Sequence, residues 1–530
     1  MQSEIYHHFN KWLYLLVLVA GGLSVFAFAP FKLYPLAWLT PAVLFYALSK
    51  ANTKKEYFKL GFVFGIGFYG AGASWPFYSM YFFAHLPLPV ALFGTSLFVL
   101  MLALLTTGLF GWLASLFRHR PLFARLLLFY PAAWVMFEWF REWFLTGFPW
   151  LYLGNSQIDG IFAAYAPITG VLGVSYVSVL IAGALLSFFI GNSVQRVVHI
   201  PPDPDSRLVN TNMQVEERLS SSIRILSALI IILLTVAAIA LENVNWTTQT
   251  GKAIKVSVLQ SNISQEEKLD PNSLIPSLAL YRSMTKASRG SDLIVWAETS
   301  LFDSFNRHMK SLILPLQGSI RKRKQSILIG GFHINENNQV ENSVLALSSD
   351  AREIYSKRHL VPFGEYIPML EYVRLLEKWI ALPPFSNIES GVNSGTLEVA
   401  GQIAQMTICY EDAFGSEMIK SMPQATMLIN VSHDGWFSHS LEPEQHMQIA
   451  RMRSLEMGRY MVRSTTTGPS GIIDEKGNLI ATAPIYTRKV ITHKVQPFTG
   501  LTPYARWGNY LIVGIISFVL LLGLIWKREE

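Results

Sequence analysis

The sequence predicts a chain of two parts, a polytopic α-helical membrane domain and a water-soluble domain of mixed strands and helices. Of its 530 residues, 51% are hydrophobic and 15% are charged, and the mean hydropathy is +0.32. A soluble protein of this length would struggle to keep such a composition in water. Residues 243 to 505 differ, because they contain no long apolar run and alternate short β-branched segments with polar helices and turns.

The membrane domain is predicted from apolar runs that are long enough to cross a bilayer. A helix needs about 20 apolar residues to span the hydrocarbon core. We count about eight such runs, near residues 12 to 29, 33 to 49, 58 to 83, 88 to 117, 122 to 140, 160 to 190, 225 to 241 and 507 to 526. We therefore expect seven spanning helices in residues 1 to 242, and an eighth with a short cytoplasmic tail in residues 506 to 530.

Basic residues in the connections between these runs predict the orientation, because Lys and Arg flanks stay on the cytoplasmic side. One set of alternate connections holds most of them: Lys50, Lys54, Lys55, Lys59, Arg118, Arg120, Arg196, Arg207, Arg218, Arg224, Lys527 and Arg528. The opposite set holds little beyond Lys32 and Arg141. Both termini are expected in the cytoplasm and residues 243 to 505 outside it. The net charge of +7 therefore reflects topology and not nucleic-acid binding.

The soluble domain is predicted to be a layered α/β structure. Short apolar segments predict strands at residues 253 to 260, 292 to 296, 326 to 332, 343 to 347, 353 to 357, 402 to 408 and 425 to 431. Helices are expected from about Ser273 to Ser288 and from Leu441 to Val462, where apolar residues recur at near-helical spacing. The turn from Asp474 to Gly477 joins two further strand segments as a hairpin.

Three side chains that follow predicted strands form a candidate catalytic group. Cys409, the one cysteine of the chain, follows a strand, as do Glu298 and Lys357, and catalytic groups gather at the ends of sheet strands. A free thiol titrates near about pH 8.5, so a thiol nucleophile needs a base or a positive environment. Glu298 would accept its proton, while Lys357 would make the sulfur anionic at neutral pH and stabilise an oxyanion. A helix beginning near Phe414 would point its positive end toward the sulfur.

Two alternatives compete with this group. His359, two residues after Lys357 on the same strand face, would form a Cys-His pair with Cys409. A solitary cysteine is also commonly a small buried hydrophobic residue without chemistry.

Histidines near residue 440 could suggest a metal site, and a stretch near residue 370 is amphipathic. His433, His439 and His446, with Asp434, match no compact ligand motif, so no metal is expected. The stretch from Tyr366 to Ile380 has opposed apolar and charged faces. It is predicted either as a lid that touches the membrane or as a helix that covers the domain's own core.

Several motifs of the sequence resemble those of the apolipoprotein N-acyltransferases, a membrane-embedded family of the nitrilase superfamily. The similar stretches are Glu138 to Gln157 (EWFREWFLTGFPWLYLGNSQ), Trp296 to Ser300 (WAETS), Lys357 to Pro368 (KRHLVPFGEYIP), Thr407 to Glu411 (TICYE), Asp434 to Phe437 (DGWF) and Gly500 to Asn509 (GLTPYARWGN). The resemblance runs nearly end to end. It departs from the family at Ala297, where proline commonly precedes the glutamate, and at His433, where asparagine is usual.

The resemblance implies a nitrilase-like αββα sandwich with Glu298, Lys357 and Cys409 as its catalytic triad. It also implies supporting or substrate-binding roles for Glu365, Tyr410, Glu411 and Trp246.

The activity that the resemblance implies is a ping-pong acyl transfer without cofactor. Cys409 would take an acyl chain from a phospholipid as a thioester and pass it to the N-terminal amine of a diacylated apolipoprotein. The enzyme would act as a monomer in a bacterial inner membrane, with its catalytic domain on the periplasmic side. An amidase that hydrolyses the acyl-enzyme, and a transporter or scaffold with an inactive hydrolase domain, remain alternatives.

Overall fold

The computed structural model describes residues 2–190, 194–200, 211–217, 220–368, 387–437 and 439–526. The chain forms two compact units. The helical unit comprises Met1–Ser74, Leu92–Val244 and Asn509–Glu530, and the sheet unit comprises Trp75–Ala91 and Asn245–Gly508. The stretch from Tyr366 to Ile380, predicted as a lid or a core helix, falls for the most part outside the described residues.

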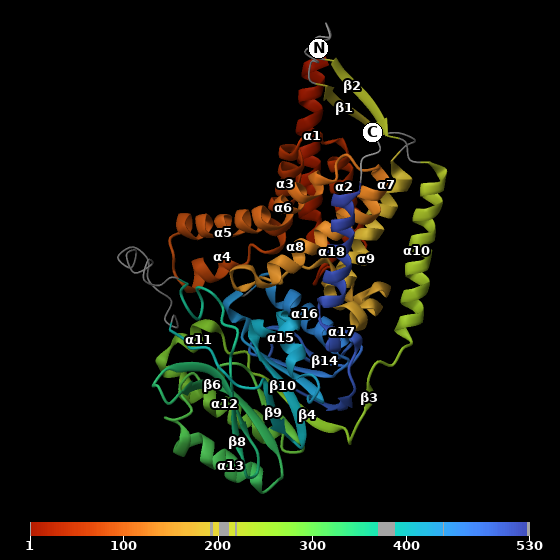
Figure 1. Cartoon of the computed structure of the whole chain (residues 1–530). Coiled ribbons are helices and arrows are strands. Elements are labelled where there is room, and N and C mark those ends of the chain that lie inside the picture. The colour runs from red at the N-terminus through yellow and green to blue at the C-terminus, as the bar shows by residue number, and fades with distance from the viewer. Residues whose placement is uncertain are drawn as a thin grey trace. The chain divides into compact units, whose positions relative to one another are not determined.

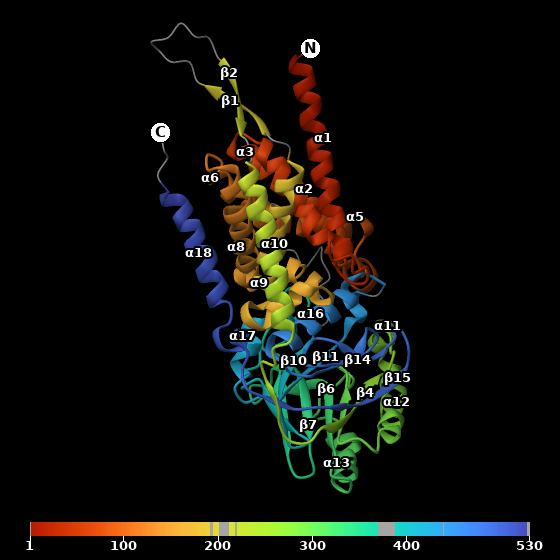
Figure 2. The ribbon, with the colours of Figure 1, turned by 90° about the vertical axis from the view of Figure 1, so that its right-hand side faces the viewer.

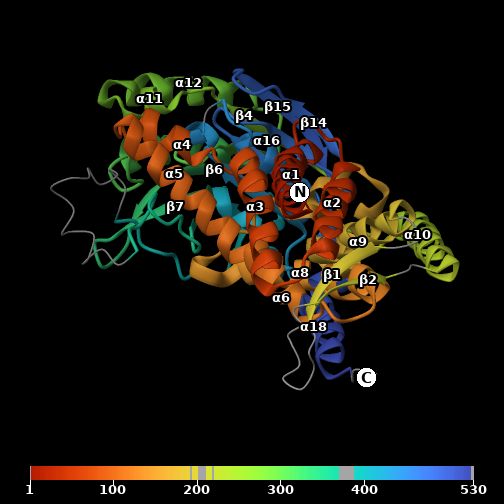
Figure 3. The same ribbon diagram turned by 90° about the horizontal axis from the view of Figure 1, so that it is seen from above.

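The helical unit consists mainly of long apolar helices (Figure 1). They are α1 (Gln2–Leu23), α2 (Leu36–Lys50), α3 (Lys54–Gly72), α6 (Leu109–Leu116), α8 (Tyr130–Trp143), α9 (Ala166–Phe189), α10 (Ser221–Glu242) and α18 (Tyr510–Ile525), with most of α5 (Leu88–Ala103). Figure 3 shows α1, α2 and α3 side by side, and Figure 2 shows α10 in front of α9, with which it is in contact. A capping box begins α3, because the Thr53 hydroxyl accepts from the N–H of Glu56 while the Glu56 carboxylate accepts from that of Thr53.

Every predicted apolar run overlaps a helix of this unit. Among the described residues, four helical stretches are long and apolar enough to cross a membrane: Leu88–Leu116, Leu122–Thr146, Ile161–Phe189 and Ser221–Glu242. Shorter apolar helices cover Lys11–Ala27, Leu36–Lys50 and Tyr510–Ile525. The membrane character of the unit is confirmed, and the number of eight spans stays a prediction.

The expected span from 58 to 83 is wrong as a single helix. The helix α3 ends at Gly72, and separate short helices, α4 (Pro76–Tyr78) and η2 (Ser79–Phe83), follow it. Pro76 accounts for the break, because a proline lacks the N–H that would donate to the carbonyl of Gly72, four residues earlier, and its ring would clash with that carbonyl. The segment after the break packs within the sheet unit, where the Trp75 ring lies 4.5 Å from that of Phe437 and the Phe83 ring 5.9 Å from that of Trp436.

The sheet unit contains two six-stranded sheets. One has the order β15-β4-β5-β6-β7-β8, with β15 (Lys489–Val495), β4 (Ile254–Gln260), β5 (Leu293–Trp296), β6 (Ser326–Ile334), β7 (Val340–Leu347) and β8 (Arg352–Ser356). The other has the order β14-β13-β12-β11-β10-β9, with β14 (Leu479–Ala483), β13 (Ser470–Ile473), β12 (Met461–Thr465), β11 (Met427–Ser432), β10 (Gln402–Ile408) and β9 (Thr396–Val399).

Both faces of each sheet are buried, which makes the unit an αββα sandwich. In β5, Leu293 and Val295 face the core between the sheets, while Ile294 and Trp296 face a second core that includes the helix α12 (Leu274–Ala287). This is why β5 is a continuous apolar run without alternation. On the outer side of the other sheet lies α16 (Glu442–Met457). The layered α/β prediction is confirmed.

Two local predictions in this unit need correction. The helix expected from Leu441 to Val462 is confirmed as α16, but it ends at Met457, because Gly458 adopts the left-handed conformation that stops helices, and strand β12 follows. The helix expected near Phe414 is only the four-residue α15 (Gly415–Met418), preceded by a 3₁₀ turn, η11 (Cys409–Ala413). A single turn carries little of the dipole that was expected to act on the sulfur.

Candidate active site

The ends of three strands position the candidate catalytic side chains. Strand β5 pairs parallel with β6, and β6 and β8 each pair antiparallel with β7, so β5 and β8 run in the same direction. Glu298 and Lys357 therefore leave the same edge of one sheet. Cys409 follows β10 in the facing sheet. The three groups are close enough for Glu298 and Lys357 each to shift the pKa of the Cys409 thiol.

A bridging amide links the two carboxylates beside Lys357. The ammonium Nζ of Lys357 lies 2.8 Å from Oε2 of Glu365. Nδ2 of Asn342, on β7, donates to Oε1 of Glu298 at 2.8 Å and to Oε1 of Glu365 at 2.9 Å. Lys357 is 1% exposed and Glu298 is 6% exposed, so these charges are held by each other and by Asn342 and not by water. The N–H of Val361 also donates to Glu365 at 2.8 Å.

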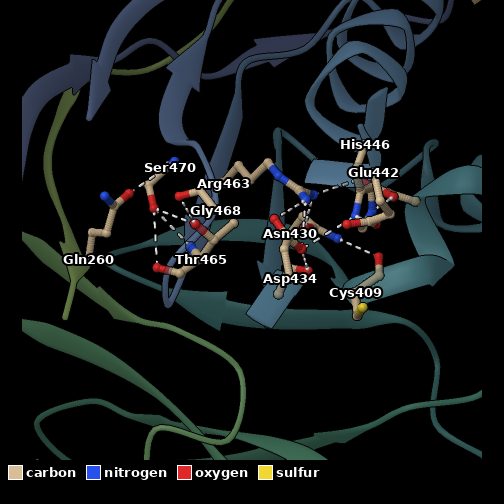
Figure 4. A network of polar contacts seen from close by, with 12 residues as sticks. Gln260, Cys409, Asn430, Asp434, Glu442, His446, Arg463, Thr465, Gly468 and Ser470 are labelled. Carbon is tan, nitrogen blue, oxygen red and sulfur yellow. Dashed lines mark hydrogen bonds and ion pairs between the residues drawn. The ribbon is translucent and has the colours of Figure 1, made fainter. Parts of the chain in front are cut away.

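Cys409 sits in a strained turn. Its φ is +53°, in the left-handed region that non-glycine residues adopt at a cost of about 1 to 3 kcal/mol. Nδ2 of Asn430 donates to the Cys409 carbonyl at 3.0 Å. Figure 4 shows this carbonyl facing Asn430 while the sulfur points away from it. Cys409 is partly exposed. The turn therefore leaves the sulfur accessible, while Asn430 binds the backbone on the side away from the sulfur (Figure 4).

The carboxylate of Glu411 ties this turn to the end of β8. Oε1 accepts from the N–H groups of Arg358 at 2.7 Å and His359 at 3.1 Å. Oε2 accepts from the N–H of Ile408 at 2.7 Å and from the Tyr355 hydroxyl at 2.8 Å. The residue after Lys357 and the residue before Cys409 therefore bind the same carboxylate.

Electrostatics at the site differ from the expectation of an anionic sulfur. Burial and the negative charge of Glu298 raise the pKa of the Cys409 thiol to about 12, against the opposing effect of Lys357. Burial lowers the pKa of Lys357, but Glu365, Cys409 and Glu298 together raise it above its usual value. Burial, with Glu365, raises the pKa of Glu298. A raised pKa favours the neutral thiol over the thiolate that the sequence predicts.

The structure also describes three other residues that the sequence singled out, which are His359, Tyr410 and Trp246. Nδ1 of His359 lies 2.9 Å from Oε1 of Glu417, and the His359 ring stacks on Phe414 at 3.7 Å. This contact turns the imidazole toward Glu417. Tyr410 is buried with its ring 5.0 Å from Phe414. Trp246 is half-buried, and among the described residues no hydrogen bond or ring contact joins it to the three strand-end groups.

The three histidines near residue 440 lie in three different environments. His433 forms a short hydrogen bond with Gln265, and the His439 ring lies 4.5 Å from that of Tyr486. His446 lies with Asp434 and Glu442, where one ligand atom of each falls within 4.8 Å of the others.

Comparison with known proteins gives the family. Residues 20–184 match the model described as apolipoprotein N-acyltransferase N-terminal domain, and residues 236–504 match the carbon-nitrogen hydrolase model. An apolipoprotein N-acyltransferase from Methylococcus capsulatus is 35% identical over 97% of this chain and 96% of its own length. Another from Coxiella burnetii is 32% identical over 96% of this chain and 99% of its own. The chain belongs to the apolipoprotein N-acyltransferase family.

The predicted enzyme class, acyltransferase, and the nitrilase-like fold are thereby confirmed. Among solved structures, a carbon-nitrogen hydrolase from Helicobacter pylori is similar to 52% of this chain over 95% of its own length, with 14% identity and a TM-score of 0.34.

The sequence did not indicate two polar residues that contact Glu298. Asn342 is the third residue of β7, so it precedes most of its strand and does not follow one as the predicted residues do. Lys268 lies in the short polar helix α11 (Gln265–Leu269). Its Nζ donates to the Glu298 carbonyl at 3.2 Å and to Oγ1 of Thr299 at 2.9 Å. Burial lowers the pKa of Lys268 to about 7, although Glu298 opposes this effect.

Replacing Glu411 with Gln should destabilise the sheet unit and abolish acylation of Cys409. An amide nitrogen cannot accept hydrogen bonds, so at least one buried N–H loses its acceptor, at a cost of about 1 to 3 kcal/mol. The matched control is Glu417→Gln, since the Glu417 side chain is 33% exposed and its carboxylate pairs with the His359 ring. Denaturant unfolding of both variants measures the effect, and equal loss in the two would contradict the role of Glu411.

Replacing Glu298 with Gln should make Cys409 easier to alkylate although acyl transfer is lost. Because the Glu298 charge raises the thiol pKa, its removal increases the thiolate fraction at a given pH. Lys357→Met should have the opposite effect, because Lys357 lowers that pKa. The rate of modification by iodoacetamide, followed by mass spectrometry between pH 7 and 10, is specific because Cys409 is the only thiol. Slower alkylation of Glu298→Gln would show that the electrostatic account is wrong.

Proposed function

We propose that this protein transfers an acyl chain from a phospholipid to the free N-terminal amine of a diacylglyceryl-cysteine lipoprotein. A thioester on Cys409 is the intermediate. Membership of the apolipoprotein N-acyltransferase family supports the reaction class. The observation that carries the assignment of roles is the convergence of a buried acid, Glu298, and a buried ammonium, Lys357, on one partly exposed thiol.

In the first half-reaction the thiol attacks the ester carbonyl of the phospholipid. As the C–S bond forms, the S–H proton moves to the Glu298 carboxylate, which the high thiol pKa makes necessary. The carbonyl oxygen becomes an oxyanion, and Lys357 stabilises it by about 3 kcal/mol, the effect typical of one oxyanion-hole donor. The C–O bond then breaks, and Glu298 returns the proton to the departing lysophospholipid oxygen.

In the second half-reaction the amine of the lipoprotein attacks the thioester. Glu298 accepts the proton that the nitrogen loses as the C–N bond forms, and the C–S bond breaks to release the sulfur. The sulfur takes the proton back from Glu298, which regenerates the free enzyme. Conversion of a thioester to an amide is strongly downhill, so neither half-reaction requires a nucleotide.

Supporting roles follow from the contacts of the neighbouring residues. Glu365 holds the Lys357 ammonium and, through Asn342, the Glu298 carboxylate. Glu411 holds the nucleophile turn, and Tyr410 packs beside it. A substrate-binding role of Trp246 stays a prediction from the family resemblance.

We also propose that the enzyme acts as a monomer in the bacterial inner membrane, with residues 243 to 505 as a periplasmic catalytic domain between the spans of 1 to 242 and the span within 506 to 530. Both substrates are anchored in lipid, so a nucleophile held at the membrane surface meets them by lateral diffusion and in a fixed orientation. Water must be kept from the thioester, since hydrolysis would waste the acyl group.

The reaction should be visible directly with purified protein. Incubation with phospholipid and a synthetic diacylated lipopeptide should give a triacylated lipopeptide. Cys409→Ala, Glu298→Gln and Lys357→Met should each reduce the rate at least about a hundredfold, as for oxyanion-hole and general-base groups. Mass spectrometry of the lipopeptide measures the product. Free fatty acid with no triacylated product would instead identify an amidase-like hydrolase, and unchanged transfer by Cys409→Ala would disprove the thioester.

The orientation can be tested with single cysteines in a Cys409→Ser background. The Asp350 side chain is 70% exposed in the sheet unit, so the Asp350→Cys variant should react with a membrane-impermeant maleimide in cells whose outer membrane is permeabilised. The Lys54→Cys variant, changed in a predicted cytoplasmic loop, should react only after the inner membrane is disrupted. The reversed pattern would overturn the proposed topology.

A further inference from the structure

A cluster of buried charges lies behind Cys409 and takes no part in the proposed reaction (Figure 4). Its members are all at most 2% exposed; they are Asp412, Asp434, Glu442, His446 and Arg463. We call this set the buried charge cluster. Charges removed from water are expensive unless they are paired, so their arrangement beside a strained turn needs a physical account.

Within the cluster, His446 is surrounded by carboxylates. Its Nε2 lies 2.8 Å from Oδ1 of Asp412, and its Nδ1 lies 3.3 Å from Oε1 of Glu442 and 3.5 Å from Oδ1 of Asp434. Both ring nitrogens face acceptors, which is the environment of an imidazolium. Burial and the charge of Arg463 lower the pKa of His446. The charge of Asp412, with the hydrogen bonds that the His446 ring forms to Asp412 and Asp434, raises this pKa well above the usual value. His446 and Arg463 are thus the two basic side chains that face the three carboxylates of the cluster.

Arg463 connects the cluster to the nucleophile turn. Its Nη1 donates to Oδ2 of Asp412 at 3.1 Å and to Oδ1 of Asn430 at 2.5 Å, and its Nη2 lies 3.4 Å from Oδ2 of Asp434. Because a guanidinium only donates hydrogen bonds, the oxygen of the Asn430 amide must face Arg463. The amide nitrogen then faces the other way, where it donates to one hydroxyl of β10 and to the carbonyl of the residue that follows this strand.

The consequence of this orientation falls on Cys409. Nδ2 of Asn430 donates to the Cys409 carbonyl and to Oγ1 of Thr407, each at 3.0 Å. Asp412, three residues after Cys409 in the same 3₁₀ turn, is held from the same side by His446 and Arg463. The left-handed backbone of Cys409 is therefore fixed at its carbonyl and at its turn by one connected set of contacts.

We propose that Asn430, Arg463, Asp412 and His446 form a positioning network that holds the backbone of Cys409 in the one conformation from which its sulfur attacks the ester. They are positioning residues, since they contact the main chain behind the sulfur and not the reacting atoms. The inference rests on the proposed role of Cys409 as nucleophile. It extends the site to residues of β11, β12 and α16 that the sequence did not indicate.

Asn430→Asp is the sharpest test, because Asp has the same shape and keeps an oxygen for Arg463 but removes the donor to the Cys409 carbonyl. We expect the single-turnover rate of Cys409 acylation by phospholipid to fall about a hundredfold, the loss typical of a misplacement by about 1 Å, with the KM for phospholipid unchanged. Arg463→Lys should have a similar effect, since one ammonium cannot reach all three acceptors.

Arg459→Lys is the matched control. Arg459 is an equally buried arginine of the same unit, but its guanidinium donates to main-chain carbonyls such as those of Ala425 and Gly500. It should lose stability as Arg463→Lys does and keep the acylation rate within about twofold. A rate loss of equal size in both arginine variants, or wild-type acylation by Asn430→Asp, would overturn the positioning role.

The pH profile of iodoacetamide alkylation separates positioning from simple destabilisation. His446 lowers the pKa of the Cys409 thiol, so His446→Gln should move the profile to higher pH, and Arg459→Lys should leave it in place. An unmoved profile for His446→Gln would count against the network. If Cys409→Ser itself retained acyl transfer, the proposed function would fail; if only the network variants behaved like wild type, this inference alone would fail.

Discussion

Four hydrogen bonds to the Glu411 carboxylate connect the two sheets of this enzyme at the point where its chemistry is expected. The loop that begins with Lys357 leaves one sheet, and the turn that begins with Cys409 leaves the other. A sandwich core of apolar side chains sets the distance between sheets, but it does not fix two irregular loops relative to each other. Glu411 does so, because it accepts from Arg358 and His359 on one side and from Ile408 on the other. The adjacent Asp412 binds the same turn to His446 and Arg463.

The electrostatic state of the site follows from this burial. The buried Glu298 carboxylate, the Glu365 carboxylate and the buried Lys357 ammonium lie beside the partly exposed thiol, and burial and Glu298 together raise its pKa to about 12. A resting thiol is less open to oxidation and to reaction with stray electrophiles than a thiolate. In the reaction that we propose, the nucleophile is generated only when a bound ester draws the proton toward Glu298. The proposed role of Lys357 is then to stabilise developing charge more than to lower the thiol pKa.

Much of this architecture could be predicted from the sequence, because it depends on local pattern. The strands of the sandwich are short β-branched runs, and Glu298, Lys357 and Cys409 each follow such a run within two residues. The apolar runs located the helices, except where Pro76 interrupts the predicted span from 58 to 83. What could not be predicted depends on contacts between distant segments. Asn342, Lys268, Asn430 and Arg463 sit within strands or short helices, and only the folded chain shows which groups they meet.

The prediction of an anionic sulfur at Cys409 is wrong for a related reason. Sequence shows which charges are near a residue in the chain, but the pKa depends on how completely water is excluded and on the sum of all neighbouring charges. Burial and Glu298 outweigh Lys357 at Cys409, and no spacing of residues reveals that balance.

If the sulfur of Cys409 carries the acyl chain between the two substrates, an acyl-enzyme must form with phospholipid alone. Mass spectrometry of the Cys409 peptide, from enzyme mixed with phospholipid and quenched in acid, detects it. We expect a fatty acyl adduct on Cys409 that disappears when a diacylated lipopeptide is added before the quench. A transfer-competent enzyme with no adduct on this peptide, or with an adduct that the lipopeptide does not remove, would contradict this role of Cys409.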